Sequence, residues 1–213
     1  MQLKTEFITF PKRIDRSNFV SKRFDKHLTS SVLDVGCYEA PLRDLLKNAS
    51  YTGVDIAGKP DIEIDLEKVD KLPFDDNAFD TVLCIDVLEH LDNLHTIFGE
   101  IIRVSKKTVI IALPNCWRDA RGPIEKGAGS FKHYGLEPEK PLDRHKWFFN
   151  IEQAINFITT RADKDGFKIQ ELFVTEKPKN SFLCSLRKLR YAGMKYHNRY
   201  SQTLWTVLEK KTT

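Results

Sequence analysis

Short apolar runs alternate with helix-like segments between residues 31 and 114, and this alternation restricts the fold more than any other feature of the chain. The apolar runs are 32–35, 51–56, 62–66, 80–86 and 107–114. Helical spacing appears at 41–47 and 91–105, where apolar residues recur every three or four positions. Continuous apolar runs are typical of parallel strands buried on both faces. The alternation therefore predicts a parallel sheet with helices packed against it.

The flanking segments complete this prediction. Residues 1–30 are polar and basic and are expected to form an N-terminal arm with a short helix at 17–27. Asn150 and Gln153 have capping-box spacing and predict a helix over 150–167, and runs 167–174 and 201–210 predict two final strands. We expect a single domain over 31–213, an α/β doubly wound, Rossmann-like sheet of about seven strands. Its last strand is antiparallel and helices cover both faces.

Two segments interrupt the pattern. Residues 115–149 have little periodicity and predict a long loop of the kind that forms lids or binding loops. Residues 175–201 form a basic insert, in which positions 177–199 hold seven Lys or Arg residues and no acidic residue. Phe182, Leu186 and Leu189 share a helix face there. The insert is either a solvated helix over the sheet edge or a surface for an anionic acceptor such as a lipid-linked or phosphorylated sugar, or RNA. Residues 177–199 could also contact an anionic membrane surface.

Composition bears on the compartment. The four cysteines lie far apart, no run of 18 apolar residues exists, and the N-terminus lacks an apolar signal core. We expect reduced thiols in a cytoplasmic protein.

The first strand runs into Asp34 and Gly36 just before a helix begins at Pro41. Ligands of open α/β sheets bind beyond the carboxyl ends of the strands. Asp55 ends the second strand, where an acidic residue typically accepts hydrogen bonds from ribose hydroxyls. The bulky Tyr38 stands where a dinucleotide loop needs glycine. These residues favour a nucleoside ligand without phosphate, such as S-adenosylmethionine.

The chain resembles the class I S-adenosylmethionine-dependent methyltransferases in five successive motifs: VLDVGCYEA, YTGVDI, IDLEKVDKLPFDDNAFD, TVLCIDVLEHL and TVIIALPN. The resemblance covers residues 31–115, with a weaker continuation to 174. It departs from the family at Tyr38 and Ala40, where glycines are usual. We expect a tighter turn around the methionine part of the cofactor and no loss of binding.

The resemblance implies a role for each residue of the cofactor site. Asp34 lies near the methionine amino group, Asp55 binds the ribose hydroxyls, and Asp65 accepts from the exocyclic amine of adenine. The backbone or side chains of six further residues line the cofactor: Gly36, Cys37, Ile56, Leu66, Cys84 and Ile85.

Methyl transfer to a hydroxyl or an ammonium needs a base, and we take His145 and Asp86 as the candidate catalytic residues. Residues 147–149 are expected to anchor the return of the long loop and so to hold His145 near the methyl group. His133 is expected to be freer. No metal is expected, because DVLEHL is frequent in metal-free members of the wider family.

Alternatives remain for the substrate and for the class of protein. The preferred acceptor is a small metabolite or a glycan or lipid-linked sugar, with nucleic acid unlikely because the basic run is short. One alternative resembles metal-assisted methyltransferases of RNA 3′ ends, with Asp86, Glu89, His90 and His145 as ligands. Another is a non-catalytic binding module of the same fold. Tyr191 and Lys195 match a dehydrogenase spacing, but the dinucleotide loop is absent.

Overall fold

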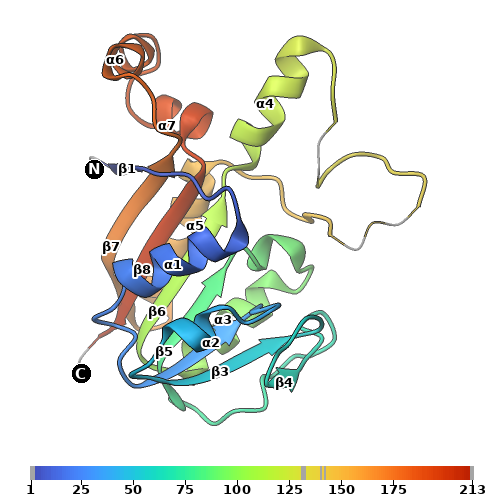
Figure 1. The fold of residues 1–213 in the computed structure, drawn as a ribbon, viewed down its shortest axis with the longest axis vertical. Coiled ribbons are helices and arrows are strands. Elements are labelled where there is room, and N and C mark those ends of the chain that lie inside the picture. Colours follow the sequence, from blue (N-terminus) through green and yellow to red (C-terminus); the bar gives the residue numbers. More distant parts are fainter. Residues whose placement is uncertain (1–2, 131–132, 140, 142, 212–213) are drawn as a thin grey trace.

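The computed structural model describes residues 3–130, 133–139, 141 and 143–211. These residues form an eight-stranded mixed sheet in the order β1-β7-β8-β6-β5-β2-β3-β4 (Figure 1). The last strand, β8, is antiparallel to both β6 and β7, and every other pairing is parallel. The expected doubly wound sheet is confirmed. The strands are β1 (Lys4–Phe7), β2 (Ser31–Val35), β3 (Ser50–Asp55), β4 (Ile62–Glu63), β5 (Phe79–Ile85), β6 (Ser105–Pro114), β7 (Phe167–Glu176) and β8 (Thr203–Lys210).

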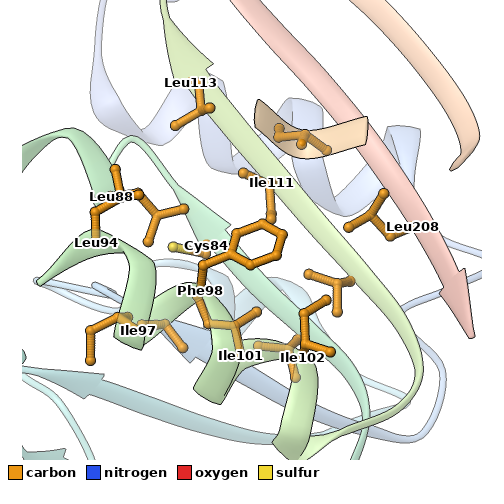
Figure 2. Close-up of a cluster of buried hydrophobic side chains, with 14 of the residues drawn as sticks. Cys84, Leu88, Leu94, Ile97, Phe98, Ile101, Ile102, Ile111, Leu113 and Leu208 are labelled. Carbon is orange, nitrogen blue, oxygen red and sulfur yellow. The ribbon is translucent and has the colours of Figure 1, made fainter. Parts of the chain in front are cut away.

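Helices cover both faces of the sheet, as expected. On one face, α1 (Arg13–Arg23) and α2 (Leu42–Leu45) pack on β2, β5, β6, β7 and β8 around the buried Trp205. On the other, α3 (Leu94–Val104) and α5 (Ile151–Lys164) build the larger core. Figure 2 shows Phe98 of α3 lying over Cys84 and Ile111 of the central strands. The apolar stripe read from the sequence is thus the buried face of α3.

The chain order reverses between β2 and β5, which are neighbours in the middle of the sheet. From β2 the chain continues outward to β3 and β4, whereas β5 leads in the opposite direction to β6. A crevice at such a reversal is the usual ligand site of an open α/β sheet. Gly36 directly follows β2 and Asp86 directly follows β5, so the turn and the candidate catalytic carboxylate share one edge.

Three predicted boundaries were wrong. Residues 4–7 of the N-terminal arm form β1, which pairs with β7 at the sheet edge and brings the strand number to eight. The helix expected at 17–27 is α1, which begins at Arg13 and ends at Arg23. The strand expected at 62–66 ends at Glu63, because Asp65 accepts a hydrogen bond from the Glu67 backbone and turns the chain.

The segment 115–149 is not a continuous loop, because its first part is the helix α4 (Cys116–Lys126). The Asn115 side chain caps its N-terminus, and Gly127 ends it with a positive φ of 61°. The sequence did not predict this helix because Gly122 and Pro123, two residues with low helix propensity, lie inside it.

The basic insert forms two helices, α6 (Ser181–Arg190) and α7 (Met194–Tyr200). Together with α4 they lie at the end of the sheet where β6 finishes (Figure 1). Within the described part of the chain, no helix has the length and apolar character needed to cross a membrane.

Candidate functional site

The turn after β2 is tightly constrained. The Gly36 and Cys37 amides donate to the Val54 carbonyl at 2.8 and 3.2 Å, which ties the turn to β3. Gly36 has a φ of 79°, and a Cβ there would lie 2.2 Å from a Val87 methyl carbon. Tyr38 and Ala40 also have positive φ values, 50° and 49°. These are the positions at which the resembling family usually has glycine, and glycine adopts this conformation at the least cost.

Two carboxylates flank the turn. Asp34 is buried and accepts a hydrogen bond from the Tyr51 hydroxyl at 2.8 Å. Burial raises the pKa of Asp34 to about 6. Asp55, at the end of β3, accepts from the backbone amides of Tyr38 at 2.8 Å and Ala57 at 3.1 Å. Asp55 therefore holds the turn and faces the same edge of the sheet.

The other predicted cofactor residues occupy different environments. Asp65 pairs with Lys68 at 2.8 Å, which lowers the pKa of that carboxyl. Leu66 is buried and Ile56 is exposed. Cys84 is buried within the core (Figure 2), where burial raises the pKa of its thiol. In the structure, therefore, the Asp65 carboxylate is paired with Lys68, and the Cys84 side chain lies below the protein surface.

A small cavity beside the turn brings in residues that the sequence analysis missed. Cys37 and Ile85 line this cavity together with Asp34 and Gly36. Arg13 and Arg16 of α1, from the N-terminal part of the chain, also line this cavity. Their only signal in the sequence is their spacing of one helical turn, which places two guanidinium groups on the same face of α1.

A second group of polar residues follows β5. Asp86 has a φ of 52° and forms an ion pair with Arg16. Its other oxygen, Oδ1, is buried without a hydrogen-bond partner among the described residues. Glu89 lies in a short 3-10 helix, η1 (Leu88–His90), and is 0% exposed. Neither Glu89 oxygen has a hydrogen-bond partner in the described chain. Such buried, unsatisfied carboxylate oxygens are costly and call for a compensating partner such as a proton, a water or an ion.

Three histidines gather beside Glu89. One ligand atom each of Glu89, His90 and His145 lies within 4.8 Å of the others. The His145 ring stands at right angles to His90, with centroids 4.5 Å apart, and stacks on His133 at 4.2 Å. The expectation that His133 is freer was wrong, because this stacking and a 3.5 Å contact with Asp143 hold it in the same group.

Backbone contacts explain how His145 reaches η1 from a distant part of the sequence. The Lys146 amide donates to the Glu89 carbonyl at 2.8 Å, and the Lys146 ammonium pairs with Glu67 and Asp92. The Trp147 indole donates to the Leu91 carbonyl at 2.7 Å. Trp147 therefore helps to anchor the loop as expected.

The two aromatic residues that follow differ in burial. Phe149 packs on the core, whereas Phe148 is half-exposed and lies against Tyr134. Tyr134 also places its hydroxyl 2.8 Å from Nδ1 of His145.

The electrostatics of this cluster of Asp86, Glu89, His90 and His145 are unusual for a surface crevice. Burial raises the pKa of Glu89 well above its ordinary value, and the nearby Asp86 raises it further. Burial raises the pKa of Asp86 as well, and it lowers the pKa of His90. A neutral imidazole beside buried carboxyl groups can accept a proton or bind a divalent cation.

Comparison with known proteins identifies the central part of the chain. Residues 33–113 match the model of the methyltransferase domain family. An uncharacterised protein of Methanocaldococcus jannaschii is 35% identical over 91 residues. That match covers 40% of this chain and 40% of the relative, so the two proteins are compared over less than half of their length.

Solved structures resemble nearly the whole fold at low sequence identity. The methyltransferase domain of bacterial CtHen1-C superposes with a TM-score of 0.62 at 18% identity, over 94% of this chain and 99% of that one. The small RNA methyltransferase HEN1 gives 0.63 at 15%, over 100% of this chain and 27% of that one. Magnesium protoporphyrin IX methyltransferase of Synechocystis PCC 6803, solved with S-adenosylhomocysteine, gives 0.56 at 15%, over 93% and 83%. At these identities the likeness concerns the fold.

Proposed function

We propose that this chain is a class I S-adenosylmethionine-dependent methyltransferase, which the family match of residues 33–113 and the shared fold support. It binds S-adenosylmethionine at the β2 turn and transfers the methyl group to an oxygen or nitrogen acceptor. One observation supports this most directly. Gly36 and the carboxylates of Asp34 and Asp55 meet at the point where the strand order reverses. The ribose hydroxyls bind Asp55, and the methionine end lies towards Asp34, Arg13 and Arg16.

A titration of the purified protein with S-adenosylmethionine tests the proposal. Asp55→Ala removes the acceptor of two ribose hydrogen bonds and is expected to weaken binding by about 2–4 kcal/mol. The matched control is Asp75→Ala, which removes an exposed aspartate of the turn before β5 and should leave the dissociation constant unchanged. Because Asp55 also holds the Tyr38 amide, the melting temperature of each variant is measured in parallel. Equal affinity of a folded Asp55→Ala protein and its parent would refute the assignment.

His145 and Asp86 are the residues to which we assign the acceptor side of the reaction. In-line transfer from a sulfonium requires mainly that the nucleophile be positioned, and a hydroxyl must also lose its proton. The His145 imidazole, oriented by Tyr134, can take that proton. A small metabolite or a glycan or lipid-linked sugar fits this role, and a cytoplasmic location is part of the same proposal.

The buried oxygens of Glu89 favour a second candidate, in which the cluster holds a divalent cation. Carboxylate oxygen and imidazole nitrogen are a ligand set that binds such ions. Neither Glu89 oxygen has a hydrogen-bond partner among the described residues, and Oε1 has only a 3.8 Å contact with Nε2 of His90, so both oxygens could serve a cation. Glu89, His90 and His145 would be the ligands, with Asp86 beside them. A bound cation lowers the pKa of a coordinated hydroxyl. An acceptor with neighbouring hydroxyls, such as the 3′ end of an RNA, suits this candidate.

Calorimetric titration of metal-free protein with Mn²⁺ and with Zn²⁺ separates the two candidates. If the cluster binds a cation, one equivalent binds and His90→Ala weakens it by at least about tenfold. His95→Ala is the matched control, because His95 is an exposed histidine on α3 outside the cluster. Absence of saturable binding in the parent protein would refute the proposal that the cluster binds a cation. The metal-free reaction, in which His145 acts as the base, would then be retained.

A further inference from the structure

Helix α6 turns its apolar residues to the solvent. Phe182, Leu183, Leu186 and Leu189 are 69%, 49%, 48% and 84% exposed. At 3.6 residues per turn these positions fall within an arc of about 120°, so they form one continuous stripe. Cys184, on the opposite side, is the buried residue of this helix. An outward apolar stripe of this size is unusual on a surface helix of a water-soluble domain.

The side of α6 that faces α7 carries basic side chains, whereas a surface helix ordinarily packs through its apolar side chains. The Arg187 guanidinium lies over the Tyr200 ring, 4.5 Å from its centroid. The Lys188 ammonium lies 5.5 Å from the Tyr196 ring centroid. Cation–π contacts therefore hold α6 on α7, and the apolar residues take no part in them. The stripe is available for another surface.

Basic residues without an acidic partner lie on and near α6. Lys177, Arg190 and Lys195 are exposed, and none of them forms an ion pair within the described residues. Lys177 precedes α6, Arg190 lies on it and Lys195 lies on α7. The carboxylates that contact this region are engaged, because Glu176 pairs with Lys179, Glu125 pairs with Arg199 and Glu152 accepts from the Asn198 side-chain amide. The region thus combines an apolar stripe with uncompensated basic residues.

The stripe is held at a fixed place relative to the candidate active site. The Asn115 side-chain amide follows β6 and donates to the carbonyls of His197, Asn198 and Ser201 at the end of α7. Arg121 of α4 also lies over Tyr200, 5.3 Å from the ring centroid. Helices α4, α6 and α7 consequently project together from the sheet end that carries the carboxyl edge of β6 (Figure 1).

We propose that α6 docks on an anionic membrane surface, with Phe182, Leu183, Leu186 and Leu189 inserted at the boundary between headgroups and acyl chains. An apolar stripe beside basic residues has the chemistry of an interfacial helix, and acidic headgroups complement Lys177, Arg190 and Lys195. A second copy of the chain would bring two sets of uncompensated basic residues together. Three of the four stripe residues are leucines, and Phe182 supplies the one ring of the stripe on which a nucleic-acid base could stack, so successive bases have no aromatic platform here. The proposal is independent of methyl transfer, although a docked α6 would present the active edge to a lipid-linked acceptor.

Sedimentation with vesicles tests this docking. The full chain is mixed with vesicles of phosphatidylcholine alone and of phosphatidylcholine with about one third phosphatidylserine. We expect binding to the anionic vesicles only, weakened when NaCl is raised from about 0.1 M to about 0.5 M. Leu186→Ser combined with Leu189→Ser should reduce the vesicle-bound fraction at least about tenfold. The double change removes exposed side chains only, so cofactor affinity and melting temperature should remain those of the parent.

Matched controls separate the stripe from general effects. Ile62→Ser replaces an exposed apolar residue on β4, at the far edge of the sheet, and Lys106→Glu reverses a charge at the opposite end of β6; both should bind vesicles as the parent does. Arg190→Glu should bind more weakly than Lys106→Glu. Equal binding of the Leu186/Leu189 variant and the parent would overturn the proposal. So would failure of the parent to bind, or a parent dimer in solution that this variant converts to monomer.

Discussion

Gly36 is the residue at which steric constraint and the proposed cofactor binding coincide. Its positive φ and the 2.2 Å approach of Val87 leave no space for a side chain. Tyr38 and Ala40 show that this turn accepts side chains in left-handed conformation when their Cβ atoms have room. The requirement at Gly36 is thus both conformational and steric, and the two contributions can be measured separately.

Gly36→Ala should lower the free energy of unfolding by about 2–4 kcal/mol, since left-handed strain adds to overpacking against Val87. It should also weaken S-adenosylmethionine binding. Gly127→Ala is the control, because Gly127 has a φ of 61° and no atom near its missing Cβ. The control should cost about 1–2 kcal/mol and leave cofactor binding intact. Urea denaturation measures both variants, and equal losses would show that the Val87 contact is relieved by a small shift.

At the scale of elements, Asn115 joins three parts of the fold. It is fully buried, caps α4 by accepting from the Arg118 amide, and shares its side-chain amide among three carbonyls at the end of α7. The Asn115 backbone amide also donates to the Gln202 carbonyl at 2.7 Å, just before β8. One side chain therefore fixes both α4, which follows β6, and α7, which precedes β8.

Asn115→Ala is expected to lower the free energy of unfolding by about 2–4 kcal/mol, because it removes a cap and leaves buried carbonyls unsatisfied. Asn48→Ala, at an exposed position after α2, should change it by less than about 0.5 kcal/mol. Chemical denaturation compares the two variants. A loss at Asn115 no larger than that at Asn48 would mean that water replaces these hydrogen bonds and that α7 does not depend on them.

Elements with strong periodicity were predictable, and those defined by caps or by distant contacts were not. The central strands and α3 follow from apolar runs and a helical stripe. Helix α4 has both caps, Asn115 and Gly127, but Gly122 and Pro123 lower the helix propensity of its sequence. Strand β1 is too short to show a pattern, and it forms because β7 offers a free edge.

The residues of the candidate site also fall into those that the sequence predicts and those that depend on distant contacts. Gly36 and Asp55 follow strands and were found from local spacing. His145 was predicted at the active edge from the return of the long segment. Its approach to Glu89, together with that of His133, depends on a long-range backbone contact of Lys146, which no local pattern reveals. Arg16 likewise meets Asp86 from the opposite end of the chain.

At the scale of the whole molecule, the sheet brings the β2 turn, a carboxylate–histidine cluster and the basic, apolar helix α6 to one end. The turn follows β2, and the cluster is formed by the end of β5 and the return of the long segment. Arg16 lines the cavity beside the turn and pairs with Asp86 of the cluster. In the proposed function, the methyl donor lies on one side of Asp86, the acceptor lies on the other, and methyl transfer takes place across this position.

A crystal structure of the protein with S-adenosylhomocysteine would test this arrangement of donor and acceptor. We expect both ribose hydroxyls to lie within hydrogen-bond distance of the Asp55 carboxylate. We also expect the thioether sulfur to point towards the cluster of Asp86, Glu89, His90 and His145. A nucleoside bound elsewhere, or one at Asp55 whose sulfur is directed away from the cluster, would contradict it.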